Sequence, residues 1–266
     1  MPDRYAVIGN PVTHSKSPWI HAQFARAAGE DIEYGRLEAP VDGFVRAVEA
    51  FRAQGGKGLN VTLPFKEQAF RFCAGTSARA AAAQAVNTMV LDRGKPWGDN
   101  TDGVGLVRDL AANLGRKLAG ARILLMGAGG AAQGVLAPLA QAGAAAIVVA
   151  NRSLPRAQAL AARVPAASAC GYAALAGQSF DLVVNATSAG LVGDLPPLPP
   201  GLFRPGAFAY EMVYGRDTPF LAMARAAGAG TSDGLGMLVE QAAESFLLWR
   251  GIRPETGAVL AALRSQ

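Results

Sequence analysis

Residues 123–132 read Ile-Leu-Leu-Met-Gly-Ala-Gly-Gly-Ala-Ala, an apolar run that leads into a glycine-rich turn. Gly127, Gly129 and Ala132 fit a G-x-G-x-x-A pattern. In this pattern the first glycine permits a tight turn, and the second lets backbone N–H groups approach a pyrophosphate. The small third residue lets the next helix pack closely on the strand. Between a predicted strand and a predicted helix, the stretch indicates a dinucleotide-binding unit; the alternative is a purely structural turn.

The segments that follow alternate between strand and helix patterns. The spacing of apolar residues predicts helices over 131–142 and 154–164, and strands over 145–150, 182–186 and 207–213. Such a β-α-β-α-β order is half of a doubly wound nucleotide-binding fold. Residues 123–151 carry no charge and are longer than the roughly 20 residues of a membrane helix. Glycines and a proline divide them into short elements, however, which argues against a membrane span.

The N-terminal part of the chain has the same α/β rhythm up to residue 91. A turn-rich piece over 92–102 follows and marks a predicted domain boundary. Residues 194–205 carry five prolines and are predicted to be a loop. Two helices are predicted to close the chain, over 236–249 and 256–264.

The composition excludes several classes of protein. With 51% hydrophobic and 17% charged residues among 266, the chain is not disordered. Cys73, Cys170 and the only two histidines, His14 and His21, give no disulfide framework and predict no metal site. The N-terminus lacks the apolar core of a signal peptide, which predicts a cytoplasmic location. The net charge of +5 is spread without basic runs, which favours small anionic ligands over nucleic acid.

The end of the second predicted strand of the nucleotide unit carries no acid. An NAD-binding unit usually has Asp or Glu there for the ribose hydroxyls, but this chain has Asn151-Arg152-Ser153, with Arg156 one turn later. Guanidinium groups suit a 2′-phosphate by charge and by their forked geometry. The pattern favours NADP over NAD; the alternative is two ordinary surface arginines.

Three polar clusters stand where predicted strands end: Ser15-Lys16-Ser17-Pro18, Asn60-Val61-Thr62-Leu63-Pro64-Phe65-Lys66 and Asp99-Asn100-Thr101-Asp102-Gly103. Each has a structural explanation, because Ser17 and Asp102 could cap helices and Pro64 could begin one. Together they supply hydroxyls for a polyol, a lysine and a carboxylate. A ketone reductase needs such a set, because hydride transfer to a carbonyl leaves charge on oxygen that a lysine can stabilise and protonate. The spacing alone does not show whether Lys66 and Asp102 meet.

In this order the clusters resemble the shikimate dehydrogenase family, and the likeness runs through nearly the whole chain. It rests on Ser15-Lys-Ser-Pro, Asn60-Val-Thr-x-Pro-x-Lys66, Ala85-Val-Asn-Thr88, Gly98-x-Asn-Thr-Asp-Gly103, the Gly127 turn, Asn151-Arg-Ser153, Asn185-Ala-Thr-Ser188 and Asp233-Gly-Leu-Gly-Met-Leu-Val-x-Gln-Ala242. The resemblance implies a two-domain α/β protein: a shikimate-binding domain over 1–101, rejoined by C-terminal helices over 237–266, and a Rossmann-like NADP-binding domain over 102–236. It also implies the NADPH-dependent, reversible reduction of 3-dehydroshikimate to shikimate in aromatic amino-acid biosynthesis.

The resemblance implies site residues by position. The family's acid–base pair at the reacting oxygen corresponds to Lys66 and Asp102. Its ligands for the shikimate hydroxyls and carboxylate correspond to Ser15, Ser17, Thr62, Asn87, Tyr214 and Gln241. Its cofactor contacts correspond to Gly127, Ala128, Gly129, Gly130, Ala131, Asn151, Arg152, Ser153, Arg156, Thr187, Met212 and Gly234. The implied protein needs no metal and is a monomer or homodimer.

Two features depart from the family pattern. The acid before Tyr214 is Glu211 rather than Asp, and the loop from Tyr214 to Thr218 is one residue shorter than usual. Two alternatives to the implied activity stay open at this point. One is a quinate/shikimate dehydrogenase that uses NAD, against which Arg152 and Arg156 argue. The other is a non-catalytic NADP sensor, which would not need the Lys66 and Asp102 pair.

Overall fold

A computed structural model describes residues 1–189 and 193–265, which divide into two compact units. Unit 1 combines Met1–Gly105 with the chain from Leu238 onward, and unit 2 is Leu106–Met237. The sequence-based boundaries lie at 101/102 and 236/237. The compact units therefore place Asp102 in unit 1, together with Lys66. Two helices run across the boundaries, α5 (Asp102–Arg108) and α9 (Leu235–Arg250).

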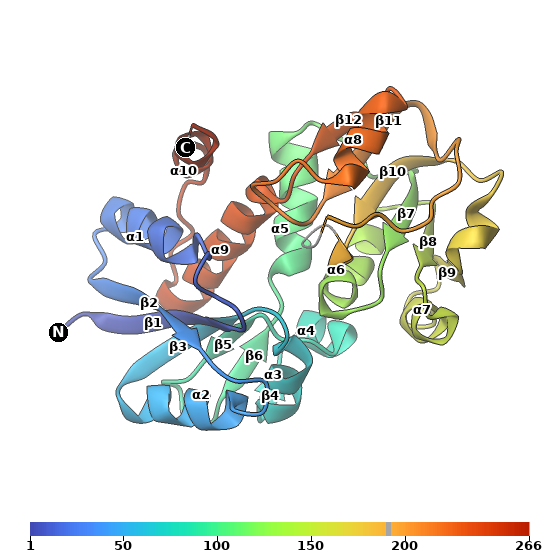
Figure 1. Cartoon of the computed structure of the whole chain (residues 1–266). Coiled ribbons are helices and arrows are strands. Elements are labelled where there is room, and N and C mark those ends of the chain that lie inside the picture. Colours follow the sequence, from blue (N-terminus) through green and yellow to red (C-terminus); the bar gives the residue numbers. More distant parts are fainter. Residues whose placement is uncertain (190–192, 266) are drawn as a thin grey trace. The chain divides into compact units, whose positions relative to one another are not determined.

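Unit 1 contains one mixed sheet with its covering helices (Figure 1). Its strands are β1 (Asp3–Gly9), β2 (Ile32–Glu38), β3 (Gly56–Val61), β4 (Gly75–Thr76), β5 (Thr88–Val90) and β6 (Trp97–Asp99). Its helices are α1 (Ser17–Ala28), α2 (Phe44–Ala53), α3 (Lys66–Phe72), α4 (Ala78–Ala83) and α10 (Gly257–Arg264), besides most of α9. The strand order is β2-β1-β3-β5-β6-β4, with β1, β2 and β3 parallel and β5 antiparallel to both β3 and β6.

Both faces of the unit 1 sheet are buried, which explains why β1 is apolar from Tyr5 onward without alternation. On one face, Phe44 and Val48 of α2 and Phe65 before α3 pack against Ile8 and Leu59. On the other face, α1 and α9 supply rings. Tyr5 stacks on Trp249 of α9 with ring centroids 4.6 Å apart, and Phe24 of α1 meets Phe246 edge to face at 6.0 Å.

His21 lies inside this aromatic layer and is fully buried. Its ring stacks on Tyr34 of β2 with centroids 4.2 Å apart, and neither ring nitrogen has a hydrogen-bond partner among the described residues. Burial lowers the pKa of His21 to about 3. The imidazole is therefore neutral and acts as an aromatic core residue.

The buried His21 makes the free energy of unfolding depend on pH. Below about pH 6.5 the unfolded chain binds a proton on His21 that the folded chain does not bind, so stability falls as the pH falls. We expect the free energy of unfolding of the wild type to drop by about 1.4 kcal/mol more than that of a His21→Phe variant between pH 5.5 and 4.5. Phenylalanine keeps a ring on Tyr34 and cannot titrate. Urea denaturation measures both, and parallel pH dependences would contradict this account.

Unit 2 is a fully parallel doubly wound sheet, as the sequence predicts. Its strands are β7 (Arg122–Met126), β8 (Ala146–Ala150), β9 (Ala167–Cys170), β10 (Phe180–Asn185), β11 (Phe203–Glu211) and β12 (Gly230–Ser232). Its helical elements are the π-helical turn η1 (Asp109–Asn113), α6 (Gly130–Gln141), α7 (Leu154–Ala161), the 3-10 turn η2 (Tyr172–Leu175) and α8 (Pro219–Ala226). The order β12-β11-β10-β7-β8-β9 makes β7 and β10 neighbours at the point where the winding reverses, where such folds bind their ligands.

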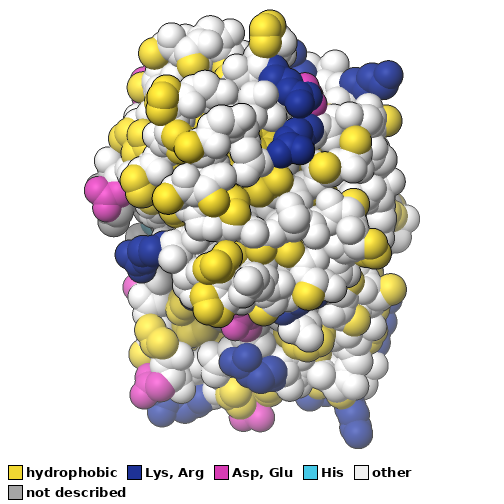
Figure 2. Space-filling model, turned by 90° about the vertical axis from the view of Figure 1, so that its right-hand side faces the viewer, with side chains coloured by type: hydrophobic (Ala, Val, Ile, Leu, Met, Phe, Trp, Pro, Cys, Tyr) yellow, Lys and Arg dark blue, Asp and Glu magenta, His cyan; other side chains and the backbone are white. Residues whose placement is uncertain are grey.

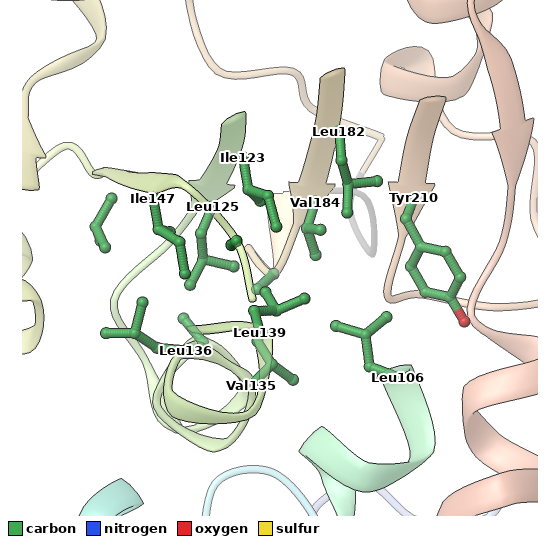
Figure 3. Close-up of a cluster of buried hydrophobic side chains, with 14 of the residues drawn as sticks. Leu106, Ile123, Leu125, Val135, Leu136, Leu139, Ile147, Leu182, Val184 and Tyr210 are labelled. Carbon is green, nitrogen blue, oxygen red and sulfur yellow. The ribbon is translucent and has the colours of Figure 1, made fainter. Parts of the chain in front are cut away.

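Alternate residues of the unit 2 strands face opposite layers. Ile123 and Leu125 of β7 point toward Val135 and Leu139 of α6 (Figure 3). Leu124 and its neighbours on the opposite face pack against the layer of α8 and η2, which includes Phe220. Buried on both faces, these strands have the continuous apolar sequences that made them recognisable.

Several short elements could not be predicted from the pattern of apolar residues. Strand β6 lies inside the piece predicted to be turns, and no strand was predicted at β9 or β12. Strand β11 begins at Phe203, inside the predicted loop 194–205. Its pairing with β10 shifts register between Phe180 and Leu182, and Gly206 there has φ of +77°. Proline and glycine thus occupy a bulge, the place in a sheet where they are tolerated.

The charged side chains on one face of the molecule are dispersed, as the absence of basic runs in the sequence predicts. On the face shown in Figure 2, Lys and Arg side chains are spread out, with Asp and Glu among them. No helix among the described residues is long and apolar enough to cross a membrane. The described residues also contain no cluster of three or more His, Cys, Asp or Glu side chains suited to a metal ion.

Candidate active site

The structure brings Lys66 and Asp102 together, although 36 residues separate them in the chain. Lys66 is the first residue of α3, and Asp102 is the first residue of α5. Lys66 Nζ lies 2.6 Å from Asp102 Oδ2, and the two side chains are 15% and 6% exposed. The Asp102 carboxylate therefore serves as the partner of a lysine and not as a helix cap. The result is an ammonium group in contact with a carboxylate and partly shielded from water.

Asn87 and Gln241 join this pair. Asn87 Nδ2 donates to Asp102 Oδ1 over 2.8 Å and lies 3.3 Å from Gln241 Oε1. Gln241 Nε2 donates to the Leu238 carbonyl oxygen one turn earlier in α9. Gln241 is 8% exposed, so the alternative of an exposed polar residue on α9 is wrong. Four predicted site residues thus form one hydrogen-bonded cluster in unit 1.

Asp99 anchors the loop that carries Asp102, a role that sequence reasoning missed. Arg79 of α4 binds both Asp99 oxygens, at 2.7 and 2.6 Å, and the Asn100 backbone N–H donates to Oδ1 over 2.7 Å. Arg79 also lies 3.1 Å from Glu244 of α9. No spacing rule links an arginine to an acid 20 residues later, so only the fold reveals this contact.

Ser15, Ser17 and Thr62 lie where parallel strands β1 and β3 end. The Ser17 N–H donates to Ser15 Oγ over 3.2 Å, and Arg36 holds the Ser15 backbone oxygen at 2.7 Å. The reading of Ser17 as a helix cap is wrong, because Ser17 already belongs to α1 and the hydroxyl of Ser15 satisfies its N–H. Among the described residues no hydrogen bond joins these three to Lys66 or Asp102.

The glycine turn after β7 has the geometry that its sequence requires. Gly127 has φ of +106°, and a Cβ there would lie 2.9 Å from the Ala186 oxygen at the end of β10. Gly129 caps α6, and a Cβ there would meet nothing within 4 Å. Space is therefore open beside the first N–H groups of a twelve-residue helix, where an anion is favoured. Gly130 and Ala131 are the first two residues of that helix, and Ala128 is buried in the turn.

The polar segment after β8 offers unpaired positive charge. Asn151 Nδ2 donates to the Ser153 oxygen over 3.0 Å, and Ser153 is the N-cap of α7. Arg152 and Arg156 are exposed, and neither has an ion pair or hydrogen bond within the described parts of the chain. Both guanidinium groups are therefore available to an anionic ligand.

Thr187, Met212, Gly234 and Tyr214 follow strands β10, β11 and β12 in unit 2. Thr187 Oγ1 donates to Asn185 Oδ1 over 2.7 Å. A Cβ at Gly234 would lie 2.4 Å from the Met212 oxygen, so no larger residue fits there without a backbone shift. Tyr214 belongs to unit 2, whereas the other predicted substrate ligands belong to unit 1.

Glu211, the departure from the family pattern, is a fully buried anchor of the Tyr214 loop. Its carboxylate accepts hydrogen bonds from Asn185 Nδ2 (2.8 Å), Thr218 Oγ1 (3.0 Å) and the Val213 N–H (3.2 Å). Burial raises the pKa of Glu211, against the lowering effect of these donors. Glutamate thus fixes both the segment before Tyr214 and Thr218, which caps α8.

Three family models match the chain. The shikimate dehydrogenase substrate binding domain matches residues 7–89, shikimate / quinate 5-dehydrogenase matches 109–192, and the shikimate 5′-dehydrogenase C-terminal domain matches 234–264. These matches cover both units described above.

Whole proteins are also similar over their full length. A shikimate dehydrogenase (NADP(+)) from Aromatoleum aromaticum is 58% identical, over 99% of this chain and 98% of the relative. The crystal structure of an Ael1 enzyme from Pseudomonas putida is 50% identical with a TM-score of 0.91, covering 98% of each chain. A shikimate 5-dehydrogenase from Thermus thermophilus, crystallised with NADP(H) and shikimate, is 35% identical with a TM-score of 0.89, covering 99% of each.

Proposed function

The chain belongs to the shikimate dehydrogenase family, and we propose that it reduces 3-dehydroshikimate to shikimate reversibly with NADPH, as a step of aromatic amino-acid biosynthesis. The observation that carries the proposal is the 2.6 Å contact between Lys66 Nζ and Asp102 Oδ2 at a site of low exposure. A positioned acid–base pair of this kind is what carbonyl reduction needs from the protein.

Lys66 has two tasks in this reaction. Its ammonium group stabilises the negative charge that develops on the carbonyl oxygen, and it delivers the proton to that oxygen. Asp102 holds the ammonium group in place, and Asn87 holds Asp102 from the other side. In the direction of oxidation the neutral Lys66 amine takes the proton back, and Asp102 again holds the Lys66 side chain in place.

We propose that the remaining polar residues hold the ring substituents. Hydroxyl and amide groups match the hydroxyls and carboxylate of shikimate, which offer both donors and acceptors. The assigned set is Ser15, Ser17, Thr62, Asn87, Tyr214 and Gln241. The substrate-binding domain would then comprise 1–101 and 237–266, and the NADP domain 102–236.

The residues of unit 2 suit a dinucleotide phosphate. NADP, when bound, supplies or accepts the hydride. The open space at Gly129 and the N–H groups of α6 fit a pyrophosphate, and the free guanidinium groups of Arg152 and Arg156 fit a 2′-phosphate. Asn151, Ser153, Thr187, Met212 and Gly234 complete the proposed cofactor contacts. NAD is disfavoured, since no acid follows β8 to bind the ribose hydroxyls.

A set of four assays tests the substrate and the cofactor together. Purified protein is given shikimate or quinate with NADP or NAD, and the initial rate of nicotinamide absorbance change is measured. We expect strong turnover only with shikimate and NADP. Comparable rates with quinate or NAD would indicate the broader quinate/shikimate dehydrogenase, and no rate in any assay would favour a non-catalytic NADP sensor. A cytoplasmic location and a monomeric or homodimeric state stay predictions.

A further inference from the structure

A chain of hydrogen bonds leads from the partly buried Tyr34 through the interior of unit 1 to Asp102. Its contacts run from Tyr34 OH to Asn60 Oδ1 (2.7 Å), from Asn60 Nδ2 to Ser245 Oγ (2.9 Å), from Ser245 Oγ to Thr88 Oγ1 (2.8 Å), from Thr88 Oγ1 to Asn87 Oδ1 (2.9 Å) and from Asn87 Nδ2 to Asp102 Oδ1 (2.8 Å). The Thr88 and Ser245 side chains at its centre are fully buried. Neither side chain forms a hydrogen bond with Lys66 or Asp102 in the described part of the chain.

Sheet pairing and helix packing bring these residues together. Asn60 of β3 lies opposite Thr88 in the antiparallel pairing with β5, and Asp99 of β6 lies opposite Thr88 on the other side. Ser245 comes from α9, one turn after Gln241, whose backbone oxygen it meets at 3.0 Å. Thr88 is the residue at which both strands and α9 converge.

Backbone groups fix the direction of the chain of hydrogen bonds. The Thr101 backbone N–H donates to Asn87 Oδ1 over 2.8 Å, so the other end of the Asn87 amide must be the NH₂ group that faces Asp102. Asn87 Oδ1 can only accept, so the Thr88 proton must lie between Thr88 Oγ1 and this oxygen. Ser245 Oγ carries one proton and lies within reach of two acceptors, Thr88 Oγ1 at 2.8 Å and the Gln241 backbone oxygen at 3.0 Å. Asn60 Nδ2 also donates to Thr88 Oγ1 directly, over 3.2 Å. From Asn60 through Thr88 and Asn87 the donors therefore point toward the Asp102 carboxylate, and each can polarise the next.

We propose that Thr88 is a positioning residue of the reaction proposed above. Its hydroxyl holds the Asn87 amide, and Asn87 in turn holds the Asp102 carboxylate toward Lys66. This inference rests on the proposed roles of Lys66 and Asp102. Thr88 is not among the proposed ligands of substrate or cofactor, so its role is to hold Asn87.

Two substitutions at Thr88 separate the hydroxyl from the shape of the side chain. Thr88→Val keeps the shape and removes the hydroxyl, whereas Thr88→Ser keeps the hydroxyl and removes a methyl group. For Thr88→Val we expect kcat with shikimate to fall about tenfold, the effect of losing one buried hydrogen bond, while the Kd for NADP is unchanged. For Thr88→Ser we expect most of kcat to return. All rates are expressed per folded molecule, after thermal melts and circular dichroism.

A control variant reports the effect of destabilisation alone. Val90 lies two residues further along β5, on the same side of the strand, and packs with Tyr5 and with Trp249 of α9. Val90→Ala should lower Tm and leave kcat per folded molecule unchanged. If Thr88→Val does not fold, Ser245→Ala breaks the same chain of hydrogen bonds one residue earlier and should also lower kcat.

Distinct results overturn the inference. If the Thr88→Val protein keeps the wild-type kcat, Thr88 does not position Asp102. The same follows if Thr88→Ser loses as much kcat as Thr88→Val, since shape and not the hydroxyl would then matter. If only Ser245→Ala folds, an unchanged kcat in that variant overturns the inference. An inactive wild-type protein overturns the proposed function, and this inference with it.

Discussion

Replacing Lys66 with alanine should lower kcat for shikimate and NADP by about 10²- to 10⁴-fold, with a smaller change in KM. This is the usual effect of removing one positioned acid–base group. The loss falls on kcat because charge develops on the oxygen, and the proton moves, only on the way through the transition state. Steady-state kinetics with both substrates varied gives the two constants separately.

Removing Lys66 also leaves a buried carboxylate without its cation, which can destabilise unit 1. Thermal unfolding of the variant must therefore accompany the kinetics. Lys57→Ala is the matched control, because Lys57 lies on β3 of the same unit and pairs with Asp3 at 2.6 Å, at a partly exposed site. We expect it to keep the wild-type kcat. If a folded Lys66→Ala protein keeps the wild-type kcat, Lys66 is not the acid–base group of the reaction.

The strands of the two sheets differ in how well the sequence could predict them. In unit 2, local chemistry determines the pattern: Gly127 needs a positive φ, and strands buried on both faces are apolar throughout. Strands β6, β9 and β12 have no more than four residues and include glycine or small side chains. They form because a neighbouring strand is present to pair with them, and their own residues give no signal of it.

The candidate site shows the same division. Residues that would meet a ligand, such as Lys66, Asp102 and Asn87, belong to recognisable motifs. Residues that act through another residue do not. Asp99 and Thr88 lie within the same motifs, but their partners Arg79 and Ser245 are on elements distant in the chain. The contact between Lys66 and Asp102 likewise depends on β3, β5 and β6 pairing in register, which no spacing rule gives.

Replacing Arg152 with alanine should raise KM for NADP about 10- to 100-fold and leave the weak use of NAD unchanged. The range is that of one or two charge-assisted hydrogen bonds to a phosphate, which NAD lacks. Arg152 follows β8, where doubly wound folds hold the adenine ribose, and no described residue neutralises its charge. Because the guanidinium is exposed, salt screens the interaction, and the effect should shrink as ionic strength rises.

Two comparisons make this result specific to the 2′-phosphate. Arg204→Ala removes an exposed arginine of the same unit that is already paired with Asp181 at 3.0 Å, and it should change neither KM. Arg156→Ala should act like Arg152→Ala, because Arg156 lies in the first turn of α7, four residues after Arg152. The measurement is the ratio of kcat/KM with NADP to kcat/KM with NAD. That ratio should fall in both arginine variants, and equal losses with the two cofactors would contradict the assignment of these guanidinium groups to the 2′-phosphate.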